Sequence, residues 1–240
     1  MIADAAIEGP FGPRPALATI LTQYRSALVA HARWKYRFPE DKAQDLIQSF
    51  VQVEILQNGL IANAEGGKGR FRSYLLTALD RFAIDRYRHD FAAKRAPTDG
   101  RLTSLNHDTP QPRCAEPSDP FELEWARAVI DQTIRRVHQN CEQSSRPEVW
   151  GVFKARLIQP YLDQQPPEPY SQLALRLGFE TPKQAGNALT TAKRMFRRCL
   201  QEVVAEYEPD LKTIPLEIDA LGEVLGVLGA ESWPRLRIHY

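Results

Sequence analysis

Apolar residues recur at steps of three and four along the first 95 residues, the spacing that gathers side chains on one face of an α-helix. They predict a helix over 16–36, a second that starts after Pro39 with acids in its first turn, and a longer third over about 70–95. A glycine-rich loop over 63–69 separates the last two. The second stripe is Leu46, Phe50, Val53 and Leu56/Gln57, and the third is Phe71, Leu75, Ala78/Leu79 and Phe82.

The pattern changes between residues 96 and 120. This stretch holds five prolines and little periodic apolar pattern, and it is longer than the loops that compact domains usually contain. Helices resume at Phe121, and another covers 148–162. No segment alternates with a period of two. The sequence therefore predicts an all-α fold of two small helical domains joined by a Pro-rich linker.

The segment 170–207 has the pattern of a helix-turn-helix. A short helix closed by Gly178 precedes a turn and a second helix, whose apolar positions follow steps of four, three and four: Ala185, Leu189, Ala192 and Phe196. The polar side chains between them are suited to base edges and phosphates, and the candidates are Gln184, Asn187, Thr190, Thr191, Lys193 and Arg194. The spacing alone fits a plain helical hairpin equally well.

Composition describes an ordinary folded chain, but its charges are segregated. Hydrophobic residues make up 43%, charged residues 25%, and the net charge is +1. Eight Lys/Arg against three acids lie in 68–95, four bases and no acid in 193–198, and eight acids against one lysine in 202–231. Arginines interleaved with Tyr74 and Tyr87 suit single-stranded nucleic acid, whereas a solvated amphipathic helix with aromatic core residues is the alternative.

No motif indicates an enzyme, a metal or a cofactor. The stretch 66–69 lacks the first glycine and the Ser/Thr of a phosphate loop and follows a helix. Histidines are scattered, and the three cysteines fit no zinc spacing. Neither a signal peptide nor an apolar run of about 20 residues is visible, so we expect a cytoplasmic protein without membrane insertion.

Several motifs, in this order, resemble bacterial RNA polymerase sigma factors of the extracytoplasmic-function (ECF) type. Residues 40–50 resemble the Asp-Leu-x-Gln-x-Phe core of region 2, and 69–79 resemble the segment that follows it. Residues 116–126 resemble the Phe-Glu-x-x-Trp-Ala helix of one subgroup, and 170–178 with the next helix resemble region 4. The resemblance implies a region 2-like domain over 1–95, a linker over 96–120, a region 4-like domain over 121–209 and an acidic amphipathic extension over 210–240.

This resemblance implies a sigma factor whose partners are core RNA polymerase and promoter DNA. The first domain would bind the polymerase through Asp45 and Gln48 and melt the −10 element, with the loop 63–69 near a flipped base. The linker would run toward the polymerase cleft, and the second domain would read the −35 element. An anti-sigma factor or other regulator is a further candidate partner. The DNA contacts of the first domain would come from Arg70, Arg72, Arg81, Arg86 and Arg88. Because Arg72 and Arg88 lie off the predicted apolar stripe, we expect their replacement to weaken DNA opening.

Other interpretations stay open. Family members place Lys, Ser, Arg, His and Arg along the recognition helix, and the matching residues here are Gly186, Asn187, Ala188, Thr190 and Thr191. This loss of charge fits a sigma-derived adaptor with weakened −35 reading. An ordinary helix-turn-helix regulator would leave the first domain unexplained. Asp80 places an acid beside the DNA-facing helix. The extension carries apolar residues at near-helical spacing, namely Leu216, Ile218, Leu221, Leu225 and Leu228. If it docks on the basic segment 193–198, it would act as a brake on DNA binding. If it docks on the core of the second domain, it would act as a cap.

Overall fold

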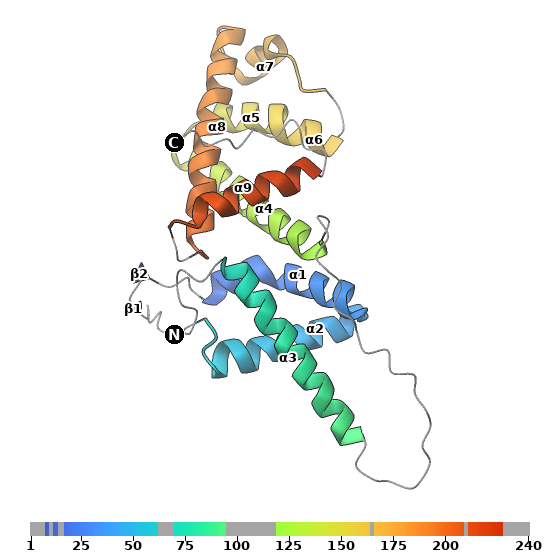
Figure 1. Cartoon of the computed structure of the whole chain (residues 1–240). Helices are drawn as coiled ribbons and strands as arrows, with labels where there is room; N and C mark the ends of the chain where they lie inside the picture. The colour runs from blue at the N-terminus through green and yellow to red at the C-terminus, as the bar shows by residue number, and fades with distance from the viewer. Residues whose placement is uncertain are drawn as a thin grey trace. The chain divides into compact units, whose positions relative to one another are not determined.

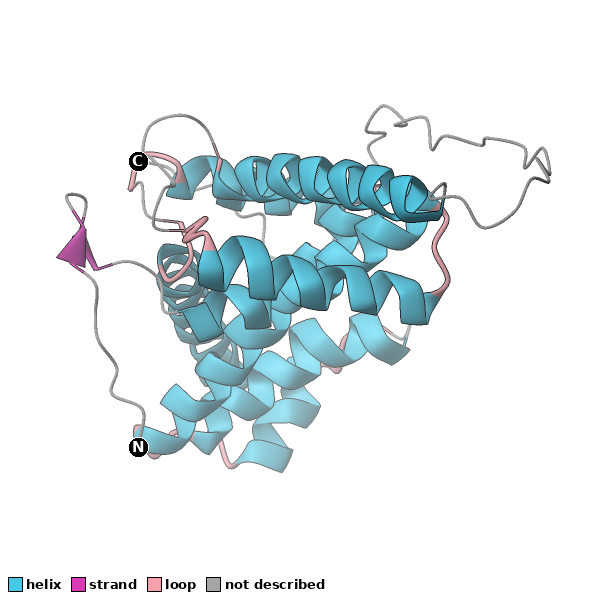
Figure 2. Cartoon of the chain, turned by 90° about the horizontal axis from the view of Figure 1, so that it is seen from below, coloured by secondary structure: helices cyan, strands magenta, loops and turns pink. Residues whose placement is uncertain are grey.

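The computed structural model describes residues 8–9, 12–13, 17–61, 70–94, 119–163, 166–208 and 211–227. The described chain is helical apart from short connecting turns and one antiparallel pair of two-residue strands, β1 (Glu8–Gly9) and β2 (Gly12–Pro13) (Figure 2). The predicted all-α fold class is confirmed.

The chain divides into two compact units, residues 1–125 and 126–240 (Figure 1). The first contains α1 (Leu17–Tyr36), α2 (Glu40–Phe50), the π-helical segment η1 (Val51–Gln57), α3 (Phe71–Lys94) and the first turns of α4 (Pro120–Gln143). The second contains the rest of α4, α5 (Pro147–Phe153), the π-helical segment η2 (Lys154–Ile158), α6 (Gln159–Asp163), α7 (Tyr170–Leu177), α8 (Pro182–Ala205) and α9 (Ile214–Val227).

The apolar stripes of α1, α2 and α3 form the core of the first unit. The largest fully buried side chains from these helices are Tyr24, Leu28, Ile47, Phe50, Leu75 and Leu79. Val53 of the predicted stripe is half-buried, but the prediction is wrong at Leu56/Gln57, because the chain after Phe50 winds as a π-helix and changes the phase of its side chains. Ile55 is buried, and Leu56 is 57% exposed.

In the second unit, α8 packs against α5, α7 and α9. Its predicted inward residues, Ala185, Leu189, Ala192 and Phe196, are all buried. The predicted stripe of the tail is only partly correct: Ile218 and Leu221 are buried, but Leu216 is 49% exposed. Residues two apart in a helix point about 200° apart, so Leu216 and Ile218 cannot share a face. Residues beyond 227, Leu228 among them, lie outside the described chain.

Candidate nucleic-acid interface

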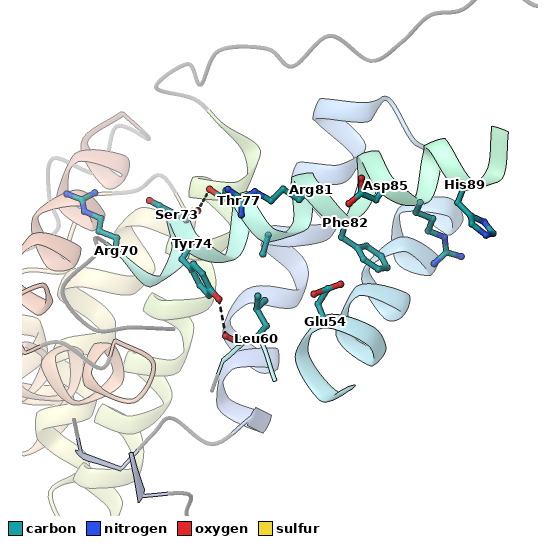
Figure 3. Close-up of a pocket in the computed structure, with 12 residues that line it drawn as sticks. Glu54, Leu60, Arg70, Ser73, Tyr74, Thr77, Arg81, Phe82, Asp85 and His89 are labelled. Carbon is teal, nitrogen blue, oxygen red and sulfur yellow. Dashed lines mark hydrogen bonds between the residues drawn. The ribbon is translucent and has the colours of Figure 1, made fainter. Parts of the chain in front are cut away.

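A long groove follows one face of α3. It encloses about 1000 Å³, and its walls come from α3, η1 and the turn after η1 (Figure 3). The lining residues are Glu54, Leu60, Arg70, Ser73, Tyr74, Thr77, Ala78, Arg81, Phe82, Asp85, Arg86 and His89. The groove therefore combines cationic groups with aromatic rings, and it also contains two carboxylates, Glu54 and Asp85.

The cationic and aromatic residues share this face because of their helical spacing. Arg70, Tyr74, Thr77 and Arg81 follow one another at steps of four, three and four. Arg88 lies seven residues beyond Arg81 and is not part of the groove lining. The Arg81 and Arg88 side chains are exposed. Arg88 meets Asp85 across 3.8 Å with both side chains about three-quarters exposed, so this pair binds the arginine only weakly. Arg70, Arg81 and Arg88 thus form a cationic ridge along α3.

Tyr74 is the aromatic residue at the centre of this ridge. Its ring is 37% exposed, and its hydroxyl donates a hydrogen bond to the Leu60 carbonyl oxygen at 3.1 Å (Figure 3). Burial raises the pKa of the Tyr74 phenol, Arg81 lowers it, and Glu54 raises it further. The phenol is therefore neutral at physiological pH and holds a fixed, partly exposed ring face.

Phe82 and Glu54 also line the groove. Phe82, predicted as a core residue, is half-buried, and its ring meets the edge of Phe50 at a centroid distance of 5.6 Å. Glu54 reaches the groove from η1. Sequence reasoning missed Glu54 because the α-helical period does not apply to a π-helical turn.

Asp80, which the sequence places beside the DNA-facing helix, binds α1 instead. Its carboxylate accepts hydrogen bonds from Lys35 Nζ and Tyr36 Oη, both at 2.5 Å, and lies 3.1 Å from His31 Nε2. Burial would raise the pKa of Asp80, but the hydrogen bonds from these three side chains outweigh burial and lower it to about 2. The carboxylate is held against α1 and is not part of the groove lining.

Arg72 lies on the core side of α3, so the prediction that it lies off the apolar stripe is wrong, and its contact with DNA stays a prediction. It is 4% exposed, and its Nη1 donates to Glu122 Oε2 at 2.6 Å. Its guanidinium lies 4.2 Å from the centre of the Trp125 ring. Residue 72 precedes Leu75 and Leu79 by three and seven positions, which places it on the buried face.

The two residues predicted to face the polymerase, Asp45 and Gln48, are exposed on α2. They lie on the side away from the buried residues Leu46, Ile47 and Phe50. Both side chains are available to a partner protein, and polymerase binding by them stays a prediction.

The predicted recognition helix, α8, has fewer available polar groups than its sequence indicates. Thr181 and Gln184 form a capping box, in which the Gln184 side-chain oxygen accepts from the Glu180 and Thr181 amides at 2.8 and 3.3 Å. The Thr190 and Thr191 hydroxyls donate to backbone carbonyls four residues earlier.

Three predicted contacts remain on α8 without such a local hydrogen bond. Asn187 and Arg194 are exposed, and Lys193 is half-buried. Gly178, between α7 and α8, has φ +76°, the left-handed conformation that glycine adopts readily. The loop 63–69 and residues 95–118, where the predicted base-flipping loop and most of the linker fall, lie outside the described chain.

Within the described residues, no cluster of three or more His, Cys, Asp or Glu side chains could hold a metal ion. No helix in that part of the chain combines the length and the apolar character needed to cross a membrane. The chain matches no protein-family model, no curated protein and no solved structure.

Proposed function

We propose that this chain is a sigma factor that binds core RNA polymerase and directs promoter recognition, DNA melting and transcription initiation. The observation that carries the proposal is the groove along α3, where Arg81, Arg86 and Tyr74 face the solvent while the neighbouring acid Asp80 is held against α1. The ordered sequence motifs described above support the same function. A cytoplasmic location follows from the proposal, since the polymerase works there.

The chemistry of the groove suits an unpaired DNA strand. Exposed arginines neutralise successive phosphates, and each base has a face that stacks on an aromatic ring for about 1–3 kcal/mol. Tyr74 supplies such a ring at low entropic cost, because its hydroxyl is already fixed on Leu60. A strand bound here would leave its duplex partner, which is the outcome that melting requires.

In this proposal the second unit contributes a helix-turn-helix made of α7 and α8. The capping box at Thr181 fixes the start of α8, and Asn187 and Arg194 are exposed along it. A helix of this kind enters the major groove and reads base edges with its polar side chains. It would read the −35 element.

Reconstitution with core RNA polymerase tests the function directly. The purified protein and core enzyme transcribe genomic DNA, and start sites are mapped. Specific start sites that disappear in an Arg81→Gln/Arg86→Gln double variant support the proposal. The matched control is Arg135→Gln, which removes an exposed arginine on α4, outside the groove.

The alternative is a sigma-derived adaptor, or a helix-turn-helix regulator, with weakened −35 reading. Hydrogen bonds within α8 favour this alternative, because the side chains of Gln184, Thr190 and Thr191 are hydrogen-bonded to nearby backbone groups. Stable binding to core polymerase without specific initiation would support the adaptor. Specific duplex binding without any affinity for the polymerase would support the regulator. Both results contradict the sigma-factor proposal.

A further inference from the structure

Residues 119–125, the docked turn at the start of α4, complete the core of the first unit. Phe121 is fully buried; its ring stacks on Tyr24 at a centroid distance of 6.2 Å and meets the His31 ring at 6.3 Å. Trp125 is also fully buried, with the Arg72 guanidinium over its ring. These contacts join the docked turn to both α1 and α3.

Polar groups fix the orientation of the docked turn. The Asp119 carboxylate accepts a hydrogen bond from the Phe121 amide at 2.9 Å, which is an N-cap. The Glu122 carboxylate accepts from Arg72 at 2.6 Å, and the Arg72 side chain is only 5% exposed. A hydrogen bond between charged groups in a partly buried site is stronger and more directional than a surface pair. Directional hydrogen bonds therefore fix the orientation of the docked turn, in addition to the burial of Phe121 and Trp125.

Because the docked turn belongs to the first unit, the boundary between the two units does not lie in the Pro-rich stretch. Lys94 at the end of α3 and Asp119 both belong to the first unit, so the Pro-rich stretch connects two parts of the same unit. The chain passes from the first unit to the second inside α4, between Trp125 and Ala126. The sequence places this boundary in the Pro-rich stretch.

We propose that the docked turn is a built-in ligand of the first unit, held in a receptor site formed by Tyr24, His31 and Arg72. The ligand this site fits is a helical turn with aromatic residues at i and i+4 and a glutamate at i+1, which Phe121, Trp125 and Glu122 supply here. The docked turn then holds the second unit to the first even when the chain is cut within 95–118. This inference does not depend on the proposed function.

Cleavage of the full chain tests this inference. The recognition sequence of a site-specific protease is introduced between residues 104 and 110, and complete cleavage is verified by mass under non-denaturing conditions. We expect the two pieces to co-elute in size-exclusion chromatography. Glu122→Gln, which keeps the shape of the side chain and removes its charge, should weaken their association by about tenfold or more. Trp125→Ala should release the pieces, and Arg135→Gln on the exposed side of α4 should change nothing.

Two results would overturn the inference. In one, the pieces of the wild-type chain separate as soon as it is cut, so the turn does not hold them. In the other, they stay together equally well in Glu122→Gln and Trp125→Ala, so other contacts hold them. Because Glu122→Gln leaves the apolar core unchanged, it remains informative if Trp125→Ala loses its helical circular dichroism.

Discussion

Asp80 and Arg81 are neighbours on α3 with opposite roles, because successive residues of a helix point about 100° apart. Asp80 faces α1, where Lys35 and Tyr36 donate hydrogen bonds to it, and Arg81 lines the groove. This separation keeps a third carboxylate out of a groove that Glu54 and Asp85 already line, and so limits the repulsion of a bound phosphate.

Asp80 should make the stability of the protein depend on pH in the acid range. Its pKa falls from 3.8 to about 2 on folding, so the folded state favours the charged carboxylate. The resulting stability, roughly 2 kcal/mol, is fully present above about pH 4 and is lost as the pH falls toward 2. Urea unfolding of wild type and Asp80→Asn should differ by this amount at pH 7 and converge near pH 2. A constant difference between the two proteins across this range would contradict the assignment.

Arg81 and Arg86 should set the salt dependence of single-strand binding. Each arginine that neutralises a phosphate adds about 0.7 to the slope of log affinity against log salt concentration for single-stranded DNA. We expect Arg81→Gln and Arg86→Gln each to lower this slope by that amount in fluorescence titrations with an oligonucleotide. Arg135→Gln is the control. Variants with unchanged slopes would place the DNA elsewhere.

At the scale of elements, the apolar period predicts the helices and their buried faces wherever the chain winds as an ordinary α-helix. The inward residues of α8 and the Phe71–Leu75–Leu79 stripe of α3 are examples. Prediction failed at Leu56 because η1 is π-helical, and at Arg72 because a long charged side chain occupies a core position by pairing with Glu122. A π-helical turn does not follow the α-helical period that the prediction used. Arg72 is in phase with Leu75 and Leu79, but its partner Glu122 lies 50 residues further along the chain.

Two glycines around the turn between α7 and α8 should respond oppositely to alanine. Gly186 lies inside α8, and a Cβ there meets nothing within 4 Å, so Gly186→Ala should stabilise the protein by about 0.5–1 kcal/mol through helix propensity. Gly178 also has open space, but its φ of +76° disfavours a side chain, so Gly178→Ala should destabilise by about 1 kcal/mol. Thermal unfolding of both variants measures the contrast. Equal shifts of the same sign would contradict it.

At the scale of the molecule, the acidic extension is the part whose role the sequence leaves most open. Its helix α9 packs against α8 and buries Ile218, Leu221 and Val224. If the extension left, these side chains and the apolar surface of α8 that they cover would become exposed to solvent, at a cost of about 25 cal/mol per Å² of apolar area. An isolated helix of this length is only marginally stable in water, so α9 depends on its packing against α8 to stay folded.

Deleting residues 210–240 should therefore lower the melting temperature by several degrees and leave duplex affinity unchanged. The buried apolar residues of α9 favour this role as a cap on the core of the second unit over a brake on DNA binding. A charge-only variant, Asp219→Asn/Glu223→Gln, separates the two, since both side chains are exposed on α9 and not part of its buried face. A cap predicts little change in melting temperature or DNA binding for this variant. Tighter duplex binding by either variant, measured at low salt where attraction between the acids and the basic segment 193–198 is strongest, would establish the brake instead.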